Sequence, residues 1–287
     1  MKVLAIVTST RRAGNSEILA KEMLSALPES VDKKLIRLAD FNIEPCRACY
    51  ACLPAGKDCV IEDDFDAFLQ QVREADAVII ASPVYFLGMH TRLKLLCDRL
   101  ISVLNEAKQY SGRQCVVAIP YGVEGWQGYG IEATVSFARF LHLNVVGALP
   151  VHAANPGEAV RPDVLAQARD MASLLLPQTE GSMKTEKNLA VRQATNKDDI
   201  VCGCCGSGMI RLSGHGAIRC VICGATGRIA APFVKGGPLN CEWNITEPFR
   251  YSLEGMGEHA QRLESIKAEF IAHHREFFEL RKPYKQV

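Results

Sequence analysis

Two clusters of cysteines are the part of this sequence most able to support chemistry. The first cluster is Cys46-x2-Cys49-x2-Cys52-x6-Cys59. Three thiolates at this spacing can hold one side of an iron–sulfur cube, and a fourth slightly later completes the ligand set. The spacing therefore predicts a 4Fe-4S cluster. A four-cysteine zinc site or free thiols remain alternatives, although zinc prefers two paired Cys-x2-Cys turns.

The second cluster has the paired arrangement, Cys202-x2-Cys205-x14-Cys220-x2-Cys223. Between the pairs, residues 209–212 and 217–219 can form two strands around a Ser-Gly-His-Gly turn. This pattern predicts a zinc ribbon, a hairpin too small for its own hydrophobic core and folded by a tetrahedral metal. Iron in a rubredoxin-like site is the alternative, in which case the module would carry electrons.

The N-terminal part of the sequence, which must position the first cysteine cluster, shows strand and helix patterns in alternation. Strands that are apolar throughout are buried on both faces, as in a parallel sheet. The pattern predicts a flavodoxin-like, doubly wound, five-stranded α/β sheet with strand order 2-1-3-4-5. The expected strands are residues 2–8, 34–38, 77–81, 115–119 and 144–149, and the expected helices are 15–27, 65–72, 93–104, 128–141 and 162–176.

The expected domain spans residues 1–178 and carries the first cysteines in a loop at 45–60. Three further segments are expected after it. A polar stretch at 179–198 predicts a linker, and 199–235 is the metal module. Residues 236–287 form a C-terminal extension, in which apolar side chains from Leu263 to Phe278 lie on one helical stripe. We expect this amphipathic helix to pack on its own chain, with a dimer contact as the alternative.

Three loops that follow strands carry residues suited to a flat phosphorylated ligand. After the first strand, hydroxyls and a helix start predict a phosphate site, because unpaired backbone N–H groups and the helix dipole favour an anion there. No dinucleotide or triphosphate glycine motif is present in the sequence. The candidate phosphate-site residues are Ser9, Thr10, Arg11, Gly14, Asn15 and Ser16.

The second and third loops predict walls for a planar ring. Ser82, Pro83, Val84, Tyr85 and Phe86 follow the third strand, at the point where strand order reverses and open α/β sheets bind ligands. After the fourth strand come the candidates Tyr121, Gly122 and Gly125, where glycine lets the backbone approach a flat ligand. The alternative for the second loop is an ordinary turn with core aromatics, and the alternative for the third is a plain glycine-rich loop.

Two segments resemble those of the NADPH-dependent FMN reductases and flavodoxin-like quinone reductases. They are residues 9–16, and residues 82–86 followed by Leu93-Lys94 and Asp98-Arg99. The resemblance covers residues 1 to about 176 and implies noncovalently bound FMN. The first cysteine spacing is similar to that of the iron–sulfur flavoproteins, a branch of the same family. Thr8 and Thr10 stand where the family often has Gly and Pro. Because every strand-to-helix loop of a parallel sheet leaves the carboxyl edge, we expect the cysteine loop to open at the same edge as the flavin loops. A 4Fe-4S cluster there could exchange electrons with FMN of the same or a neighbouring subunit.

Composition and charge limit the partners and the cellular compartment expected for this protein. The chain has 287 residues, 48% of them hydrophobic, and a formal net charge of +1. Such balance gives no electrostatic reason to expect nucleic acid or a membrane as partner. No apolar run is long enough to span a bilayer, and the first strand does not read as a signal peptide. Dense cysteine without a secretion signal predicts a cytoplasmic protein that uses metal or redox chemistry.

Together these features predict an FMN- and 4Fe-4S-containing oxidoreductase with zinc or iron in the C-terminal module. The expected electron donor is NAD(P)H or a ferredoxin, and the acceptor is a quinone, an oxygen species or a protein. The resemblance also implies a homodimer or homotetramer. Two alternatives stay open: an NAD(P)H-dependent FMN or quinone reductase without a cluster, and a redox-sensing module whose ribbon contacts a partner.

Overall fold

The structure is a computed structural model. It describes most of the chain, and the described residues are 1–53, 57–106, 112–177, 192–193, 200–230, 240–244 and 250–285. Most of the expected linker therefore lies outside the described residues.

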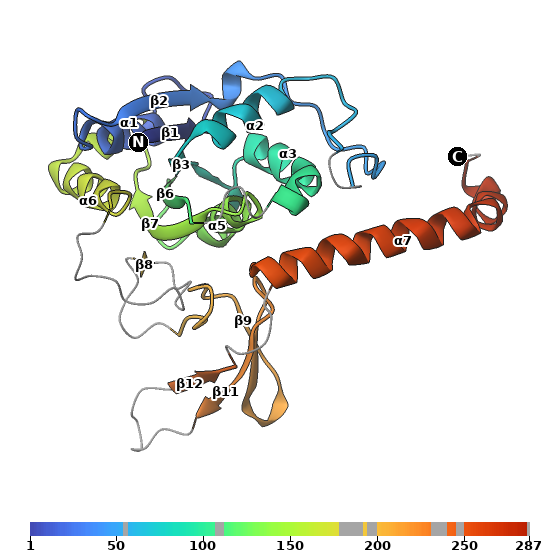
Figure 1. Ribbon diagram of the computed structural model, residues 1–287. Helices are drawn as coiled ribbons and strands as arrows, with labels where there is room; N and C mark the ends of the chain where they lie inside the picture. The colour runs from blue at the N-terminus through green and yellow to red at the C-terminus, as the bar shows by residue number, and fades with distance from the viewer. Residues whose placement is uncertain are drawn as a thin grey trace.

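A parallel sheet forms the centre of the N-terminal part (Figure 1). Its order β2-β1-β3-β6-β7-β8 contains the predicted 2-1-3-4-5 order, which is confirmed. A short sixth strand, β8, pairs in parallel with Gly147 and Ala148 of β7 and was not foreseen, since two residues carry no periodicity. The strands are β1 Lys2–Val7, β2 Asp32–Arg37, β3 Ala77–Ala81, β6 Gln114–Tyr121, β7 Asn144–His152 and β8 Arg192–Gln193.

Helices cover both faces of the sheet because successive side chains of each strand point to opposite sides. In β1, Leu4 and Ile6 join the core beneath α2, α3 and α5, whereas Val3, Ala5 and Val7 join the core beneath α1 and α6. The helices are α1 Asn15–Ser25, α2 Phe65–Glu74, α3 Thr91–Arg99, α5 Gly130–Phe140 and α6 Pro162–Ser173. Short 3-10 turns are η1 Leu38–Asp40, η2 Leu100–Glu106 and η3 Glu158–Val160.

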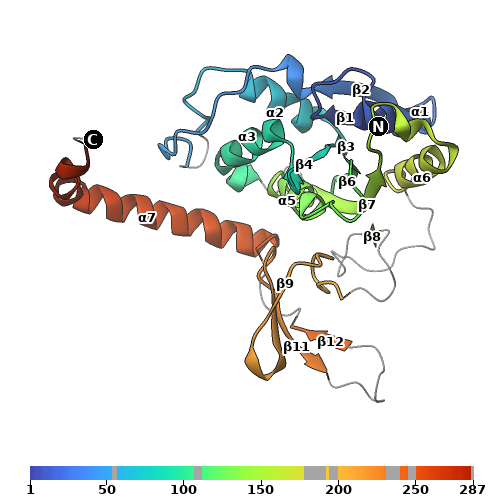
Figure 2. The same cartoon turned by 180° about the vertical axis from the view of Figure 1, so that it is seen from behind.

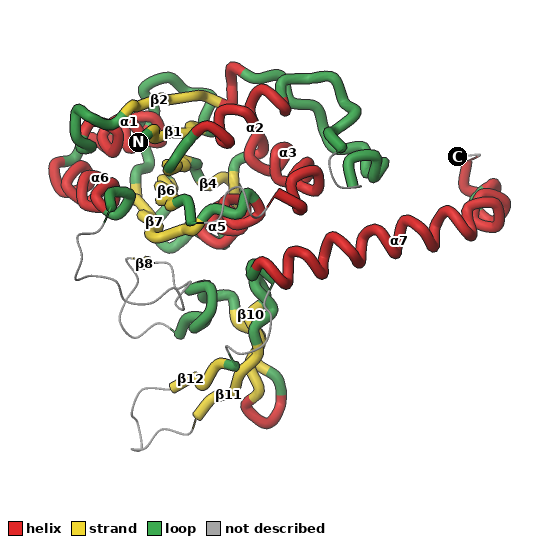
Figure 3. Tube along the Cα trace, in the orientation of Figure 1, coloured by secondary structure: helices red, strands yellow, loops and turns green. Residues whose placement is uncertain are grey.

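The C-terminal metal module is a four-stranded antiparallel sheet in the order β12-β11-β10-β9 (Figure 3). The predicted hairpin is present, with Ile218 of β10 opposite Leu212 of β9. The sheet continues beyond residue 235, because β12 pairs with β11. Its elements are β9 Ile210–Leu212, η4 Gly214–Gly216, β10 Ala217–Cys220, β11 Thr226–Ala230 and β12 Asn240–Trp243.

A long helix, α7 Leu253–Leu280, follows this module and ends in the 3-10 turn η5 Lys282–Lys285. Ser252 caps its start by accepting a hydrogen bond from the backbone N–H of Gly255 at 3.0 Å. Met256 and Ala260 are buried against Leu104 of η2, and Leu263 packs beside them, so the first turns of α7 pack on the same chain. The predicted apolar stripe beyond Leu263 is exposed in this chain. Past the contact of Lys267 with the loop that carries the first cysteines, α7 extends away from the sheet domain (Figure 2). None of the helices described is long and apolar enough to cross a bilayer.

The cysteine loop, residues 41–64 between η1 and α2, is fixed by a buried ion pair. Arg99 at the end of α3 contacts Asp63 at 2.6 Å, and neither side chain is exposed. The same guanidinium donates to the carbonyl of Glu44 at 2.9 Å, and the Asp63 carboxylate accepts from the Glu44 N–H at 2.7 Å. Sequence similarity placed Arg99 with the ring-binding segment, but in the structure it anchors the cysteine loop.

Replacing Asp63 with Asn should lower the melting temperature by about 10 °C at neutral pH, because it leaves the buried Arg99 cation unpaired. Burial alone would raise the pKa of Asp63, but hydrogen bonds and the charge of Arg99 lower it. The carboxylate therefore contributes stability above its unfolded pKa of about 4, and loses it as the pH falls through the lower folded value.

Thermal melts of wild type and D63N at several pH values test this expectation. The difference between them should shrink in acid, as wild-type Asp63 becomes protonated. Glu22→Gln, which breaks a more exposed pair with Arg169, is the control and should change the melting temperature by only a few degrees. Equal effects of the two substitutions would show that the buried pair does not anchor the loop.

Candidate active site and metal centres

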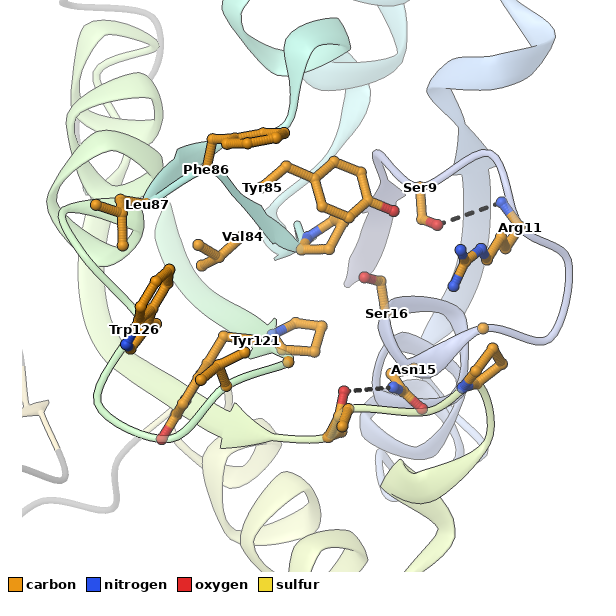
Figure 4. Close-up of a pocket in the computed structure, with 18 residues that line it drawn as sticks. Ser9, Arg11, Asn15, Ser16, Val84, Tyr85, Phe86, Leu87, Tyr121 and Trp126 are labelled. Atoms are coloured by element: carbon orange, nitrogen blue, oxygen red, sulfur yellow. Dashed lines mark hydrogen bonds between the residues drawn. The ribbon is translucent and has the colours of Figure 1, made fainter.

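One pocket of about 460 Å³ opens at the carboxyl edge of the parallel sheet. The loops after β1, β3 and β6 line it, as predicted, and a fourth loop after β7 contributes Ala153, Ala154 and Pro156. Figure 4 shows Ser9, Arg11, Asn15 and Ser16 gathered on one side. Phe86, Leu87 and Trp126 lie on the other side, so the pocket has a polar end and an apolar end.

The polar end fits a phosphate. Gly14 caps α1 without a side-chain hydrogen bond, which leaves backbone N–H groups of the first turn for a ligand. The Ser16 hydroxyl is buried and has no hydrogen-bond partner within the described part of the chain. Ser9 accepts from the backbone N–H of Arg11 at 3.2 Å, which fixes the turn. An unpaired buried hydroxyl beside a helix N-terminus is what a phosphate oxygen would satisfy.

A carboxylate at the start of α1 is neutralised, so that it does not repel an anion. Glu17 contacts Arg37 at 2.6 Å and Lys21 at 2.7 Å, and it accepts from the backbone N–H of Ala13. Burial alone would raise the pKa of Glu17, but these partners lower it. Arg37 also donates to the carbonyl of Thr10 at 2.9 Å, so this network holds the loop in shape.

Asn15 acts as a tie between two loops. Its amide nitrogen donates to the carbonyls of Ala153 and Asn155, at 3.1 and 2.9 Å. Its amide oxygen accepts from the backbone N–H groups of Gly157 and Ala159, at 2.9 and 3.2 Å. Both amide hydrogens and both oxygen lone pairs are therefore used within the protein. Although Asn15 lines the pocket as predicted, its side chain positions the phosphate loop and has no remaining capacity for a ligand.

The apolar end is built around a two-residue hairpin between β4 Val84–Tyr85 and β5 Gly88–Met89. Its turn residues, Phe86 and Leu87, have φ angles of 47° and 67°, a left-handed conformation that costs roughly 1–3 kcal/mol per non-glycine residue. Asn-Gly would be the relaxed choice for such a turn. The turn presents Phe86 fully exposed at the pocket rim, so this strain keeps an aromatic ring at the opening.

Close packing holds the aromatic rim together. The N–H of Tyr129 donates to the carbonyl of Leu87 at 2.8 Å, which joins the hairpin to the loop after β6. Gly128, with a φ of 52°, lies at this junction, and a Cβ there would come within 2.3 Å of the Leu87 carbonyl oxygen. Trp126 and Tyr85, 64% and 46% exposed, complete an aromatic border around the pocket.

Not all predicted residues line the pocket. The side chain of Thr10 is outside it, Ser82 is buried and bonded to Thr8 at 3.0 Å, and Gly125 lies outside the lining. Their neighbours in the same loops do line it, because each strand end orients only part of its loop inward. Reasoning from sequence missed several lining residues, of which only Trp126 carried an aromatic signal: Leu87, Pro120, Val123, Trp126, Ala153, Ala154 and Pro156.

His90 lies at the start of α3, close to the ring-binding segment. It is buried, and its Nδ1 caps α3 by accepting from the backbone N–H of Arg92 at 3.2 Å. Its ring packs against Tyr85 with centroids 5.3 Å apart. Burial, followed by the charge of Arg92, lowers its pKa. The neutral imidazole thus supports the aromatic wall from behind.

The first four cysteines line a second pocket, of about 160 Å³, together with Asp98, Arg99 and Ile101. The two pockets share no lining residue among those described, and α3 runs between them, since it starts beside the hairpin and ends at the cysteines. The rise along α3 from Thr91 to Arg99 is about 12 Å. The cysteines thus line a pocket of their own, separate from the one formed by the other loops.

The spacing of the sulfur atoms distinguishes the two clusters. A single tetrahedral metal with metal–sulfur bonds of about 2.3 Å holds its sulfurs about 3.8 Å apart. Cys202, Cys205, Cys220 and Cys223 have all four sulfurs within 4.8 Å of one another. Among the described residues, no three sulfurs of the first cluster come that close. Its wider arrangement suits a multi-iron cluster better than a single ion.

A buried N–H donor and a thiol with a raised pKa in the first pocket also fit a metal cluster. Arg99 Nε, buried in its wall, has no hydrogen-bond partner within the described residues. Burial would lower the pKa of Arg99, but the Asp63 carboxylate and then the Cys59 thiol raise it. Burial, followed by the negative charges of neighbouring thiolates, raises the pKa of Cys52 to about 11. A bound cation would remove this penalty by stabilising the thiolate.

The second cluster forms a closed tetrahedral shell. Cys202 and Cys223 have sulfurs 3.6 Å apart, and Cys205 and Cys220 have sulfurs 3.5 Å apart. All four side chains are buried, so no position is open to substrate. Hydrogen bonds from the other three thiols lower the pKa of Cys220. Cys241 lies on β12 and is not part of the group.

The metal module is docked on the sheet domain. Arg139 of α5 donates to the carbonyl of Cys205 at 3.3 Å, and its guanidinium lies 5.6 Å from the ring of Tyr251. Phe140 packs edge-on against the same ring, with centroids 5.3 Å apart. These contacts place the four-cysteine site next to α5. Tyr251, which makes two of them, lies just before the start of α7.

Comparisons with known proteins agree with this geometry. Residues 1–155 match the model of the NADPH-dependent FMN reductase family. An iron–sulfur flavoprotein of Methanocaldococcus jannaschii is 44% identical over 100 residues, 34% of this chain and 51% of that protein. An iron–sulfur flavoprotein of Methanosarcina thermophila is 32% identical over 146 residues, 50% of this chain and 74% of that protein. The first of these matches thus spans only about half of its relative's length.

One solved structure extends the likeness to the whole chain. A flavone reductase superposes with a TM-score of 0.73 over 100% of this chain and 97% of its own, at 18% sequence identity. At that identity the likeness is one of fold, and it includes the C-terminal region. The family match covers more than half of the chain, and the matched residues include those at the polar end and the apolar end of the pocket. The chain belongs to the NADPH-dependent FMN reductase family.

Proposed function

We propose that this protein is an FMN-dependent oxidoreductase in which a 4Fe-4S cluster exchanges single electrons with the flavin. The observation that carries the proposal is the pocket at the sheet edge, with an unpaired buried Ser16 hydroxyl at one end and aromatic walls at the other. Its volume of about 460 Å³ falls in the range of cofactor sites. FMN would supply hydride acceptance and conversion between two-electron and one-electron transfer.

The residues present divide the binding of FMN between them. The first turn of α1, Ser9 and Ser16 would hold the phosphate, and Arg11 would balance its charge. Val84 and Tyr85 on one side, with Tyr121 and Gly122 on the other, would enclose the ring and exclude water from it. The family supports NAD(P)H as electron donor, with a ferredoxin as the alternative.

The rim favours a planar acceptor such as a quinone. Phe86 is held exposed by a strained turn, and Trp126 lies on the same side of the pocket, so a flat aromatic molecule could stack there against the flavin. The structural neighbour named as a flavone reductase is consistent with a planar substrate. An oxygen species would make no use of this exposed aromatic border, whereas a protein acceptor could pack against it.

The metal centres would have separate roles. Cys46, Cys49, Cys52 and Cys59 would hold the 4Fe-4S cluster, since their spacing is ferredoxin-like and they line one pocket. The closed site in the C-terminal module would hold zinc and stabilise the fold, with iron as the alternative.

We also propose a homodimer or homotetramer, acting in the cytoplasm. Apolar side chains of α7 beyond the part packed on η2 remain exposed, among them Ile266, Phe270 and Ile271 at 47, 53 and 57%. Such a surface favours contact with another protein surface. A redox-sensing module is the second candidate function, and steady turnover with a reduced donor would exclude it.

Replacing Ser16 with Ala should weaken FMN binding about 10- to 100-fold, because one hydrogen bond to a charged phosphate is lost. Riboflavin, which lacks the phosphate, should bind wild type and S16A equally. Flavin fluorescence titrations with both ligands measure this difference. Ser25→Ala, at the other end of α1, is the matched control. A parallel loss of riboflavin affinity would contradict the assignment of the polar end.

Replacing Cys49 with Ala should remove most of the iron and the broad brown absorbance, while FMN remains, because the flavin pocket shares none of the described cysteines. Metal analysis and visible spectra of anaerobically prepared protein measure both. Cys97→Ala, a thiol outside the motif, should retain iron. If single replacements of all four motif cysteines leave iron content unchanged, the cluster assignment is wrong.

Replacing Cys220 and Cys223 together with Ser should release one metal ion and expose residues 200–230 to hydrogen exchange. A module this small has too little apolar area to fold without its metal. Exchange in the parallel sheet should stay slow, since the module contacts it mainly through α5. Retained protection in the module after metal loss would refute a structural role.

A further inference from the structure

The C-terminal helix reaches the cysteine loop through a single lysine. Lys267 Nζ donates a hydrogen bond of 2.9 Å to the backbone carbonyl of Tyr50, although the two residues are 217 positions apart. Tyr50 lies between Cys49 and Cys52. Lys267 is also the last partly covered residue of α7, since residues 268–280 are all exposed. Within the described residues, the cysteine loop is thus where the partly covered part of α7 ends.

The loop segment that receives this hydrogen bond is strained. Ala48 and Tyr50 have φ angles of 49° and 55°, in the left-handed region that is unfavourable for residues other than glycine. This backbone turn is what brings successive thiols toward the same pocket. The Tyr50 carbonyl is also the acceptor for the N–H of Leu53, a buried residue, at 3.3 Å. A strained turn persists only where surrounding contacts fix it, and Lys267 supplies one from outside the loop.

The helix that carries Lys267 is well placed to supply that contact. Met256 and Ala260 are buried against η2, whose first residues follow Arg99 directly in the chain. Ile101 of η2 both packs against this helix contact and lines the cysteine pocket. Lys267 lies seven residues beyond Ala260, about two helical turns, and the packed first turns hold it in place.

Charge is the second consequence of this position. A 4Fe-4S cluster bound by four thiolates carries net negative charge, and its reduction adds one more electron. A cation near the cluster stabilises the reduced form more than the oxidised form, so it raises the reduction potential. Arg99 supplies a buried positive charge at the wall of the cysteine pocket, and Lys267 supplies another at the Tyr50 carbonyl between Cys49 and Cys52.

We propose that Lys267 is a positioning residue of the iron–sulfur site, fixing the Cys49–Cys52 turn through the Tyr50 carbonyl and raising the potential of the cluster. This inference rests on the proposed function, because it assumes that the first four cysteines hold the cluster. It assigns to the C-terminal helix a role in the cluster site of the N-terminal domain. Because α7 follows the metal module in the chain, this helix would connect that module with the iron–sulfur site.

Lys267→Met in the full-length chain is the test, since Met keeps most of the side-chain length and removes both the donor and the charge. In the anaerobically prepared holoprotein, K267M should lose iron to a chelator about tenfold faster than wild type, and its cluster should have a lower reduction potential in a redox titration. Lys267→Arg should restore both values. Lys282→Met, which removes a charge 15 residues further along, is the matched control and should behave as wild type.

Hydrogen exchange of residues 47–53 provides a measurement that does not need the cluster. In protein prepared without iron, this segment should exchange faster in K267M than in wild type or K282M. If wild type binds no iron–sulfur cluster, the proposed function fails, and the exchange result still decides whether Lys267 fixes the turn. Unchanged exchange in K267M would overturn the inference, as would iron loss and potential equal to those of wild type.

Discussion

Parallel strands deliver all of their following loops to one edge, and this constraint governs where the protein can do chemistry. Four such loops converge on the flavin pocket, and Asn15 ties the first of them to the last with hydrogen bonds of 2.9–3.2 Å. The loop after β2, on the outer side of β1, lies too far from the switch point to join them. It carries the cysteines instead, and the buried Arg99–Asp63 pair fixes it at the far end of α3.

The parts of the structure that follow from repetition could be predicted from sequence. Continuous apolar strands such as Ala77–Ala81 specify burial on both faces, and paired Cys-x2-Cys turns specify a compact metal site. The parts that depend on contacts distant in sequence could not be predicted. Nothing in the local sequence shows that Asn15 has no capacity left for a ligand, or that Arg99 belongs to the cysteine loop. The two-residue strand β8 has too few residues to show a pattern.

The C-terminal region is more closely integrated than its composition suggests. Cysteine-rich, polar and amphipathic segments in succession resemble independent pieces joined by linkers. In the structure Tyr251 packs against Arg139 and Phe140 of α5, and α7 then runs past η2 to the Tyr50 carbonyl. A metal that folds the small module would thereby also fix the start of the helix that contacts the cysteine loop. The fold likeness to a flavone reductase extends over the whole chain and so includes this region.

The central claim is that one chain holds a flavin, a multi-iron cluster and a separate structural metal. Its most direct test is the stoichiometry of FMN, iron, acid-labile sulfide and zinc in protein purified without oxygen. The account predicts about one FMN, four iron, four sulfide and one zinc per chain. About two zinc ions per chain with no sulfide would contradict it, because both cysteine groups would then be structural sites and no electron carrier would stand beside the flavin.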